Sequence, residues 1–294
     1  MANSEHLDNF VDFMFLGYPK TGTSAIFYLL DQHPELNASK EKETRFFSWA
    51  NHMALLQESP TGLRKKYMNF WDLDHKGLKY EFSPNYYTSF SQKMIKKVKP
   101  KNKRVKLLFV LRNPVERFIS EYIHMRSLYL IAHDERAEQE LLKDIDWKWN
   151  WEKDKKYYRS ITAETLLYKS MSISELIRHE NFHGFETGEY FCHIIKAFNV
   201  FSDLSREEFK FVLYDDFKQD WKKTMKDLCN FLGVYSDHKF YEVKTNESSF
   251  WRKYVEVYKD IKPKHIQHLK TYYKPYNSML EDLLKRKLHW EEYW

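Results

Sequence analysis

Two glycines, five positions apart, frame a loop that follows a mostly apolar run near the start of the chain. The run covers residues 11–17 and ends at Gly17, and apolar residues recur at helical spacing from 23 to 32. An apolar run of this length that ends at glycine is typical of a buried strand entering a turn. The spacing of Gly17 and Gly22 is that of GxxxxGK[ST] phosphate loops, whose backbone N–H groups surround an anion at a helix amino terminus. The segment therefore predicts a strand, an anion-binding loop and a helix.

The same order of strand and helix recurs twice further along the chain. The apolar runs cover 105–111 and 209–214, and the amphipathic segments after them cover 115–128 and 217–232. Three strand-to-helix units predict an α/β fold with a central parallel sheet, a P-loop-like phosphate loop and flanking helices. In such a sheet ligands bind beyond the carboxyl ends of the strands, so we expect Gly17 and Arg112 to converge there.

Helical insertions and a final helix complete the predicted architecture. Residues 129–190 are charged, aromatic and mostly helical in pattern, and 264–288 form another amphipathic segment. No repeat and no Pro-, Gly- or Ser-rich linker interrupts the 294 residues, so we expect a single domain over 1–294.

Charge and cysteine content narrow the class of protein. The chain holds 48 Lys and Arg against 42 Asp and Glu, and the net +6 is interspersed rather than gathered in a stripe, which disfavours nucleic acid as a partner. Cys192 and Cys229 are the only cysteines, too few for a disulfide framework although enough for one bridge, and this favours a reducing compartment. Glu5, Asp8 and Asp12 stand where a secretory signal needs a basic start, and no apolar stretch of about 18 residues occurs. We expect a cytoplasmic protein with no membrane segment.

The loop departs from the nucleotide triphosphatase pattern in an informative way. Thr23 stands where that pattern needs lysine, and Lys20 lies inside the loop instead. The apolar run at 105–111 ends in Arg112 rather than in a magnesium-binding aspartate. These differences disfavour a magnesium-dependent phosphotransferase, and we expect no metal.

Residues 19–23, Pro-Lys-Thr-Gly-Thr, resemble the first signature of the sulfotransferases that use 3′-phosphoadenosine 5′-phosphosulfate (PAPS). The resemblance implies that Lys20 contacts the oxygen that bridges phosphate and sulfate. It also implies that the 5′-phosphate is bound by Thr21, Gly22, Thr23 and Ser24. A positioned ammonium stabilises the charge that develops on the bridging oxygen mainly in the transition state, so Lys20 is expected to be catalytic. The alternative is a glycine turn with an exposed lysine.

A second motif resembles the part of this family that binds the 3′-phosphate. Arg112 is followed eight residues later by Ser120, and the resemblance implies that both contact the 3′-phosphate. A guanidinium and a hydroxyl suit a phosphate monoester. Arg252 and Lys253 match loosely a late basic loop that covers the same phosphate in family members. Taken alone, Arg112 is also consistent with an arginine that forms an ordinary ion pair at the surface.

The segment from Lys40 to Trp49 resembles the Glu-x-x-Phe-Phe segment of the heparan sulfate branch of the family, and Glu43 is the matched glutamate. The resemblance implies that Glu43 is the general base toward the acceptor. The neighbouring Lys42 and Arg45 would lower the pKa of Glu43, so burial has to compensate. The alternative is that Glu41 and Glu43 are solvated charges in a polar turn.

Other acceptor-side residues follow from looser matches. Phe82 occupies the position of a family lysine in a segment that also contains Tyr86, and His193 aligns loosely with a histidine of glycan N-sulfotransferases. Without the family lysine, we expect Lys42 or Arg45 to assist Lys20, or the acceptor to be a cation. His193 is also consistent with an ordinary buried helix position.

Together the motifs predict in-line transfer of a sulfuryl group from PAPS to a hydroxyl or to an amine or guanidine nitrogen, leaving adenosine 3′,5′-bisphosphate. No cysteine-bounded loop follows Phe250-Trp251, unlike the glycan enzymes of the secretory pathway, which favours a small-molecule acceptor such as a secondary metabolite. The alternatives are a glycan sulfotransferase and a regulatory protein that binds PAPS without chemistry.

Overall fold

A computed structural model of the chain describes residues 9–48, 51–132, 135–136, 139, 183–243 and 261–292. The described chain divides into two compact units. The first unit comprises Met1–Arg112 with Tyr190–Thr245, and the second comprises Asn113–Glu189 with Asn246–Trp294. The single domain over 1–294 stays a prediction.

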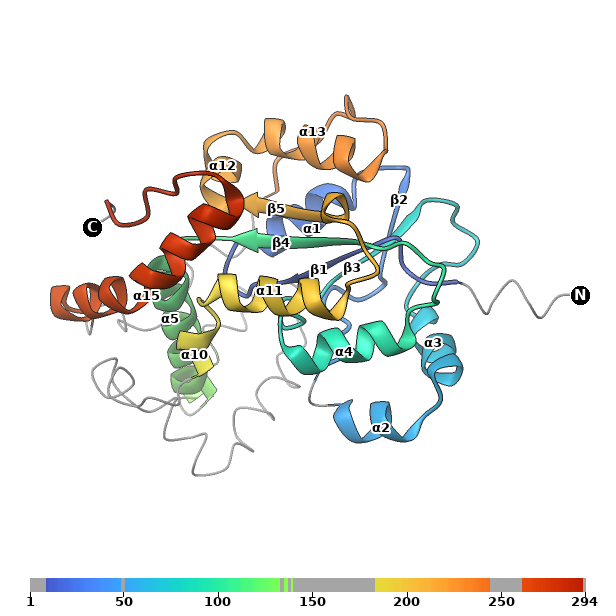
Figure 1. Ribbon diagram of the computed structural model, residues 1–294, viewed down its shortest axis with the longest axis horizontal. Coiled ribbons are helices and arrows are strands. Elements are labelled where there is room, and N and C mark those ends of the chain that lie inside the picture. Colours follow the sequence, from blue (N-terminus) through green and yellow to red (C-terminus); the bar gives the residue numbers. More distant parts are fainter. Residues whose placement is uncertain are drawn as a thin grey trace, which may run out of the picture. The chain divides into compact units, whose positions relative to one another are not determined.

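The first unit contains a five-stranded sheet in which every pair of neighbouring strands is parallel. The strand order is β2-β3-β1-β4-β5 (Figure 1). The strands are β1 (Phe13–Gly17), β2 (Leu36–Ala38), β3 (Leu78–Phe82), β4 (Lys106–Leu111) and β5 (Phe209–Leu213). The three strands expected from the apolar runs are confirmed, whereas β2 and β3 were not predicted.

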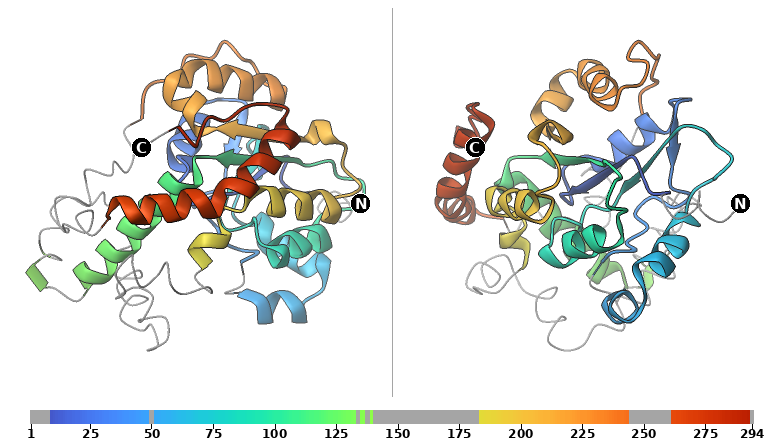
Figure 2. Two further views of the ribbon diagram at one scale, coloured as in Figure 1. Left: turned by 60° about the vertical axis from the view of Figure 1, so that its left-hand side comes forward. Right: turned by 45° about the vertical axis from the view of Figure 1, so that its right-hand side comes forward.

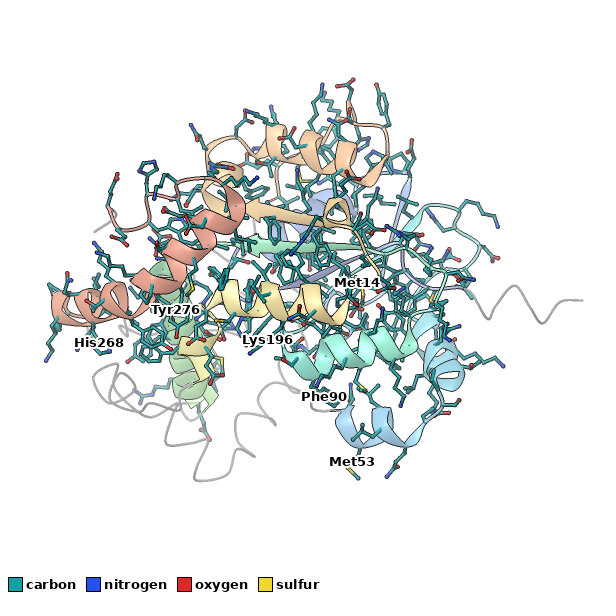
Figure 3. The ribbon with its side chains drawn as sticks, viewed as in Figure 1. Met14, Met53, Phe90, Lys196, His268 and Tyr276 are labelled. Atoms are coloured by element: carbon teal, nitrogen blue, oxygen red, sulfur yellow. The ribbon has the colours of Figure 1, made fainter. Side chains whose placement is uncertain are left out.

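Helices cover both faces of this sheet, as a parallel sheet requires. Helices α1 and α13 lie on one face, and α4 and α11 lie on the other (Figure 1 and Figure 2). The helices of the first unit are α1 (Thr23–Leu30), α2 (His52–Gln57), α3 (Pro60–Met68), α4 (Ser89–Val98), α11 (Tyr190–Val200), α12 (Tyr214–Gln219) and α13 (Trp221–Leu232). Figure 3 shows Met53 of α2 pointing away from the neighbouring helices, and 57% of it is exposed.

The helix predicted over 217–232 is two helices in the structure. The chain breaks at Asp220, whose side chain accepts a hydrogen bond of 3.0 Å from the backbone N–H of Lys223 and so caps α13. Helix α13 ends at Gly233, which has a φ of +83°. Sequence periodicity missed the break because an aspartate cap fits the polar side of an amphipathic pattern.

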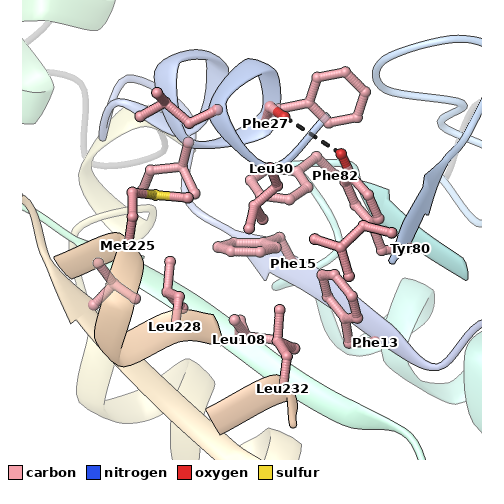
Figure 4. Packing of buried hydrophobic residues seen from close by; sticks show 14 of the residues in the cluster. Phe13, Phe15, Phe27, Leu30, Tyr80, Phe82, Leu108, Met225, Leu228 and Leu232 are labelled. Atoms are coloured by element: carbon pink, nitrogen blue, oxygen red, sulfur yellow. Dashed lines mark hydrogen bonds between the residues drawn. The ribbon is translucent and has the colours of Figure 1, made fainter. Parts of the chain in front are cut away.

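The core between the sheet and the helices α1 and α13 combines aromatic side chains of β1 and β3 with mostly aliphatic side chains of β4 and the two helices (Figure 4). Phe15 stacks on Phe82, with ring centroids 3.5 Å apart. Tyr80 donates a hydrogen bond of 3.3 Å from its hydroxyl to the carbonyl of Phe27. Because α1 packs on this core, the loop that precedes it is held against the carboxyl end of β1.

The second unit contains α5 (Pro114–Ala132), α10 (His183–Glu186) and α15 (Pro263–Leu284) among its described residues. Asn113 accepts a hydrogen bond of 3.0 Å from the backbone N–H of Val115 and so caps the start of α5. The side chain of Arg117 is fully buried and pairs with Glu121 one turn along the helix. Most of the helical insertion expected over 129–190 lies outside the described residues. No helix in the described ranges is long and apolar enough to cross a membrane.

Candidate functional site

The loop Tyr18–Gly22 joins β1 to α1 and is closed by its own hydrogen bond. The hydroxyl of Thr21 is fully buried and donates to the carbonyl of Tyr18 at 2.7 Å. Lys20 has a φ of +64° and Gly22 a φ of +86°, both in the left-handed region that most residues avoid. Two left-handed residues on either side of Thr21 turn the backbone tightly before the helix.

The amino end of α1 has the properties of an anion site. Gly22 is the cap residue, and within the described residues no side chain caps this end of the helix. The hydroxyl of Thr21 is already used within the loop, so Thr21 would bind an anion through its backbone, while the partly exposed Ser24 still presents a hydroxyl. First-turn N–H groups and the helix dipole together favour a phosphate at such a position.

Arg112 lies at the end of β4 and contacts this loop. Its Nη1 donates a hydrogen bond of 3.1 Å to the carbonyl of Lys20. Its guanidinium also lies over the ring of Tyr214, 4.8 Å from the centroid. Strands β1 and β4 are parallel neighbours, so the expected convergence of Gly17 and Arg112 at one edge of the sheet is confirmed.

Tyr214 is a residue of this site that the sequence analysis missed. A Cβ added at Gly22 would lie 2.6 Å from Cε2 of the Tyr214 ring, so the loop and the ring touch. Tyr214 begins α12 directly after β5, the strand next to β4. The rule that ligands gather beyond the carboxyl ends of parallel strands, applied to the third strand as well, would have pointed to it.

The predicted base, Glu43, is held between two cations. Its Oε1 lies 2.6 Å from Nζ of Lys42 and its Oε2 lies 2.9 Å from Nη2 of Arg45. Burial raises the pKa of Glu43, but the two cations lower it by more, so this pKa lies below its usual range. Burial was expected to offset the lowering of the Glu43 pKa by Lys42 and Arg45, and it offsets only part of it. Glu41, by contrast, is exposed. The alternative that both glutamates are solvated charges therefore fits Glu41 but not Glu43.

A family model described as the sulfotransferase domain matches residues 11–253 of this chain. The chain belongs to this family. Members of the family are PAPS-dependent enzymes, so the protein is a PAPS-dependent sulfotransferase and PAPS is its sulfuryl donor. The anion site at the start of α1 fits this donor, which carries a phosphosulfate.

One solved structure shares the fold of this sulfotransferase along almost its whole length, and two others give lower TM-scores. A sulfotransferase from Alicyclobacillus acidocaldarius matches with a TM-score of 0.61 at 21% identity, covering 97% of this chain and 100% of that one. STF9 from Mycobacterium avium gives 0.49 at 14% identity over 97% and 80% of the two chains. Mouse SULT7A1, in complex with PAP, gives 0.45 at 15% identity over 96% and 91%. The first match confirms the predicted α/β fold, and none of these findings favours the heparan sulfate branch.

Two residues predicted to contact the acceptor are buried in the sulfotransferase. Phe82 is 1% exposed and packs in the aromatic core, and Tyr86 is fully buried with its hydroxyl on the backbone N–H of Phe47. In these positions neither side chain is exposed enough to contact an acceptor directly. Phe82 takes the family lysine's position but faces the core, because its ring stacks on Phe15 of the neighbouring strand.

His193 lies on α11 in an aromatic cluster. Its ring is 4.8 Å from that of Tyr87 and 5.8 Å from that of Tyr18, and 7% of the residue is exposed. Tyr190, one turn earlier, donates a hydrogen bond of 2.8 Å to the carbonyl of Arg112. His193 thus packs among aromatic side chains while Tyr190 of the same helix holds the backbone of Arg112, which agrees with the alternative that His193 is an ordinary buried residue.

The remaining predicted residues lie either in the second unit or outside the described residues. Ser120 lies on α5 and belongs to the second unit, whereas Arg112 belongs to the first. Arg252 and Lys253 lie outside the described residues. Cys192 and Cys229 are both free thiols, so the single bridge that the sequence allowed is not formed.

Proposed function

We propose that this sulfotransferase transfers the sulfuryl group of PAPS to a hydroxyl or to an amine or guanidine nitrogen of a small molecule. The observation that carries the proposal is the tight loop with Lys20 beside the uncapped amino end of α1. In this proposal the backbone of residues 21–24 and the hydroxyl of Ser24 bind the 5′-phosphate. Arg112 and Ser120 are proposed to bind the 3′-phosphate, with Arg252 and Lys253 as further donors from the late basic loop.

The proposed reaction is a single in-line displacement. The acceptor atom forms a bond to sulfur while the bond from sulfur to the bridging oxygen breaks, and adenosine 3′,5′-bisphosphate leaves with the electron pair. The ammonium of Lys20 stabilises the charge that grows on that oxygen. Glu43 accepts the proton that the acceptor loses.

The lowered pKa of Glu43 supports a particular class of acceptor. A carboxylate held between Lys42 and Arg45 is ionised at neutral pH and ready to take a proton, yet it is a weaker base than an ordinary glutamate. General base catalysis by a weak base is most effective when the acceptor proton is itself acidic. We therefore infer that phenols are better acceptors than aliphatic alcohols.

A small acceptor is favoured over a glycan by the same ion pairs. Lys42 and Arg45 carry two positive charges between them, and the carboxylate of Glu43 offsets one of these within the protein. A polyanionic glycan needs basic side chains that the enzyme itself does not neutralise. A glycan acceptor is the second candidate, supported by the Glu-x-x-Phe-Phe likeness of the segment around Glu43.

A panel of phenols, aliphatic alcohols, amines and a heparan fragment, assayed with ³⁵S-labelled PAPS, tests this proposal. Transfer to phenols at higher kcat/KM than to matched alcohols supports it, and transfer to the heparan fragment alone refutes the small acceptor. Glu43→Gln is then assayed with the best acceptor. A loss of about 10²- to 10⁴-fold in kcat with unchanged affinity for adenosine 3′,5′-bisphosphate supports the base, and full activity refutes it.

A further inference from the structure

A buried carboxylate that the proposed mechanism does not use lies beneath the loop of the proposed base. Glu81 is the fourth of the five residues of β3 and is fully buried. Four hydroxyl groups surround it, those of Thr44, Tyr67, Ser83 and Tyr86. A buried carboxylate is unfavourable unless its oxygens accept hydrogen bonds, and here both of them do.

The two carboxylate oxygens of Glu81 have different hydrogen-bond partners. Oε1 accepts from the hydroxyls of Thr44, of Ser83 at 2.7 Å and of Tyr86 at 2.9 Å, whereas Oε2 accepts from Tyr67. The hydroxyls are the donors in all four hydrogen bonds, so each of them points its proton at Glu81. The lone pairs of the hydroxyls are consequently turned away from Glu81.

The three hydroxyls on Oε1 use those lone pairs to accept three successive backbone N–H groups. The distances are 3.1 Å from Arg45 to Ser83, 3.2 Å from Phe46 to Thr44 and 3.0 Å from Phe47 to Tyr86. Every one of these amides therefore reaches Glu81 through one intervening hydroxyl. We call this arrangement the hydroxyl relay: Glu81 Oε1, the hydroxyls of Thr44, Ser83 and Tyr86, and the amides of residues 45–47.

The backbone next to the relay is in a conformation that it would not adopt by itself. Glu43 has a φ of +62° and Arg45 a φ of +51°, and neither residue is glycine. A left-handed residue with a side chain is strained and persists only where surrounding contacts hold it. Thr44, between the two, donates a hydrogen bond from its own hydroxyl directly to Glu81.

We propose that Glu81 is a positioning residue: through the hydroxyl relay it holds residues 43–47 in the strained conformation that presents Glu43 to the acceptor. The proposal rests on the proposed function in taking Glu43 as the base. Burial raises the pKa of Glu81, and the hydroxyls offset only part of that rise. The role of Glu81 is to order the loop and not to exchange a proton with the acceptor.

Thr44 offers a matched pair of variants that tests the relay without removing the buried carboxylate. Thr44→Val keeps the shape and loses the hydroxyl, whereas Thr44→Ser keeps the hydroxyl and loses a methyl group. Hydrogen exchange of the backbone amides 45–47, measured with adenosine 3′,5′-bisphosphate bound, is expected to speed up at least tenfold in Thr44→Val and to stay near wild type in Thr44→Ser. Equal protection in all three proteins overturns the relay.

Kinetics with the best acceptor of the panel tests the link to catalysis. A displacement of about 1 Å can reduce a rate by about a hundredfold, so Thr44→Val is expected to lower kcat by ten- to a hundredfold. The KM for PAPS should not change, and Thr44→Ser should restore kcat. A role in folding alone would instead lower the amount of active enzyme and leave kcat per bound site intact. An unchanged kcat in a Thr44→Val protein that has lost amide protection overturns the positioning role.

A double variant separates this proposal from the proposed base. If the relay acts through Glu43, adding Thr44→Val to Glu43→Gln lowers kcat by less than threefold, whereas the same ten- to hundredfold loss as in the wild-type background overturns the positioning role. If Glu43→Gln alone is fully active, the base assignment fails, and the exchange of amides 45–47 still decides whether the relay exists.

Glu81→Leu and Glu81→Gln provide a second pair of variants that tests the relay. The Gln oxygen can still accept on the relay side while its amide faces Tyr67, so Gln is expected to keep amide protection and Leu to lose it.

Discussion

Alanine at Gly22 tests whether the donor loop depends on close contact with Tyr214. The substitution has two separable effects in the structure. Gly22 has a φ of +86°, which alanine tolerates poorly, and the new Cβ would lie 2.6 Å from Cε2 of Tyr214. That distance is well inside the ordinary carbon–carbon contact of about 3.5–4.0 Å, so either the loop or the Tyr214 ring, which is packed against the guanidinium of Arg112, has to shift.

Gly233 supplies a control for the first effect alone. It has nearly the same φ, +83°, but nothing lies within 4 Å of the position of its Cβ. A left-handed conformation costs a residue with a Cβ about 1–2 kcal/mol, so Gly233→Ala should reduce the free energy of unfolding by that amount. Overpacking adds about 1–3 kcal/mol, so Gly22→Ala should reduce it by about 2–5 kcal/mol.

Urea unfolding of the two variants and calorimetry with adenosine 3′,5′-bisphosphate measure both consequences. Gly22→Ala should also weaken nucleotide binding, because the loop has to shift at the amino end of α1, whereas Gly233→Ala should bind as wild type does. Tyr214→Ala in the Gly22→Ala background should recover the overpacking part of the unfolding free energy. Equal losses of stability in the two alanine variants, or an unchanged nucleotide affinity in Gly22→Ala, would refute the reasoning.

Three further predictions concern the charged groups of the site. Lys20→Ala should lower kcat by about 10²- to 10³-fold while the affinity for adenosine 3′,5′-bisphosphate, measured by calorimetry, changes little; an equal loss in both would contradict a role at the leaving oxygen. Arg112→Ala should weaken the binding of the same nucleotide by about ten- to a hundredfold, since charge-assisted hydrogen bonds contribute about 1.5–3 kcal/mol. Adenosine 5′-phosphate lacks the 3′-phosphate, so its affinity should differ much less between the variant and the wild type. Because Lys42 and Arg45 lower the pKa of Glu43, the base is ionised above that lowered pKa, and the acid limb of kcat/KM should fall below the ordinary glutamate value of about 4.3. Lys42→Met should move that limb to higher pH, and an unmoved limb would show that another group titrates.

The meeting of the loop at 17–24 with Arg112 could be predicted from the sequence because these residues are contiguous or follow one topological rule. Residues 17–24 form a continuous strand-loop-helix segment, and Arg112 follows a strand whose carboxyl end meets the same edge of the sheet. Tyr214 obeys the same rule but has no spacing signature, since a single aromatic residue after a strand is common. The contact that joins it to Gly22 depends on the rotation of a side chain, which a pattern does not contain.

The acceptor half could not be predicted to the same depth, and β3 shows why. The strand has no apolar run, since Lys79 and Glu81 alternate with Leu78, Tyr80 and Phe82, and such alternation is typical of a strand with one solvated face. A parallel sheet inside an α/β fold has no solvated face, so the alternation has to mean something else. Had β3 been recognised as an inner strand, Glu81 would have been a buried charge in need of partners. The hydroxyl of Thr44, 37 residues away, is the partner that connects this strand to the proposed base, and its distance in sequence is what concealed the connection.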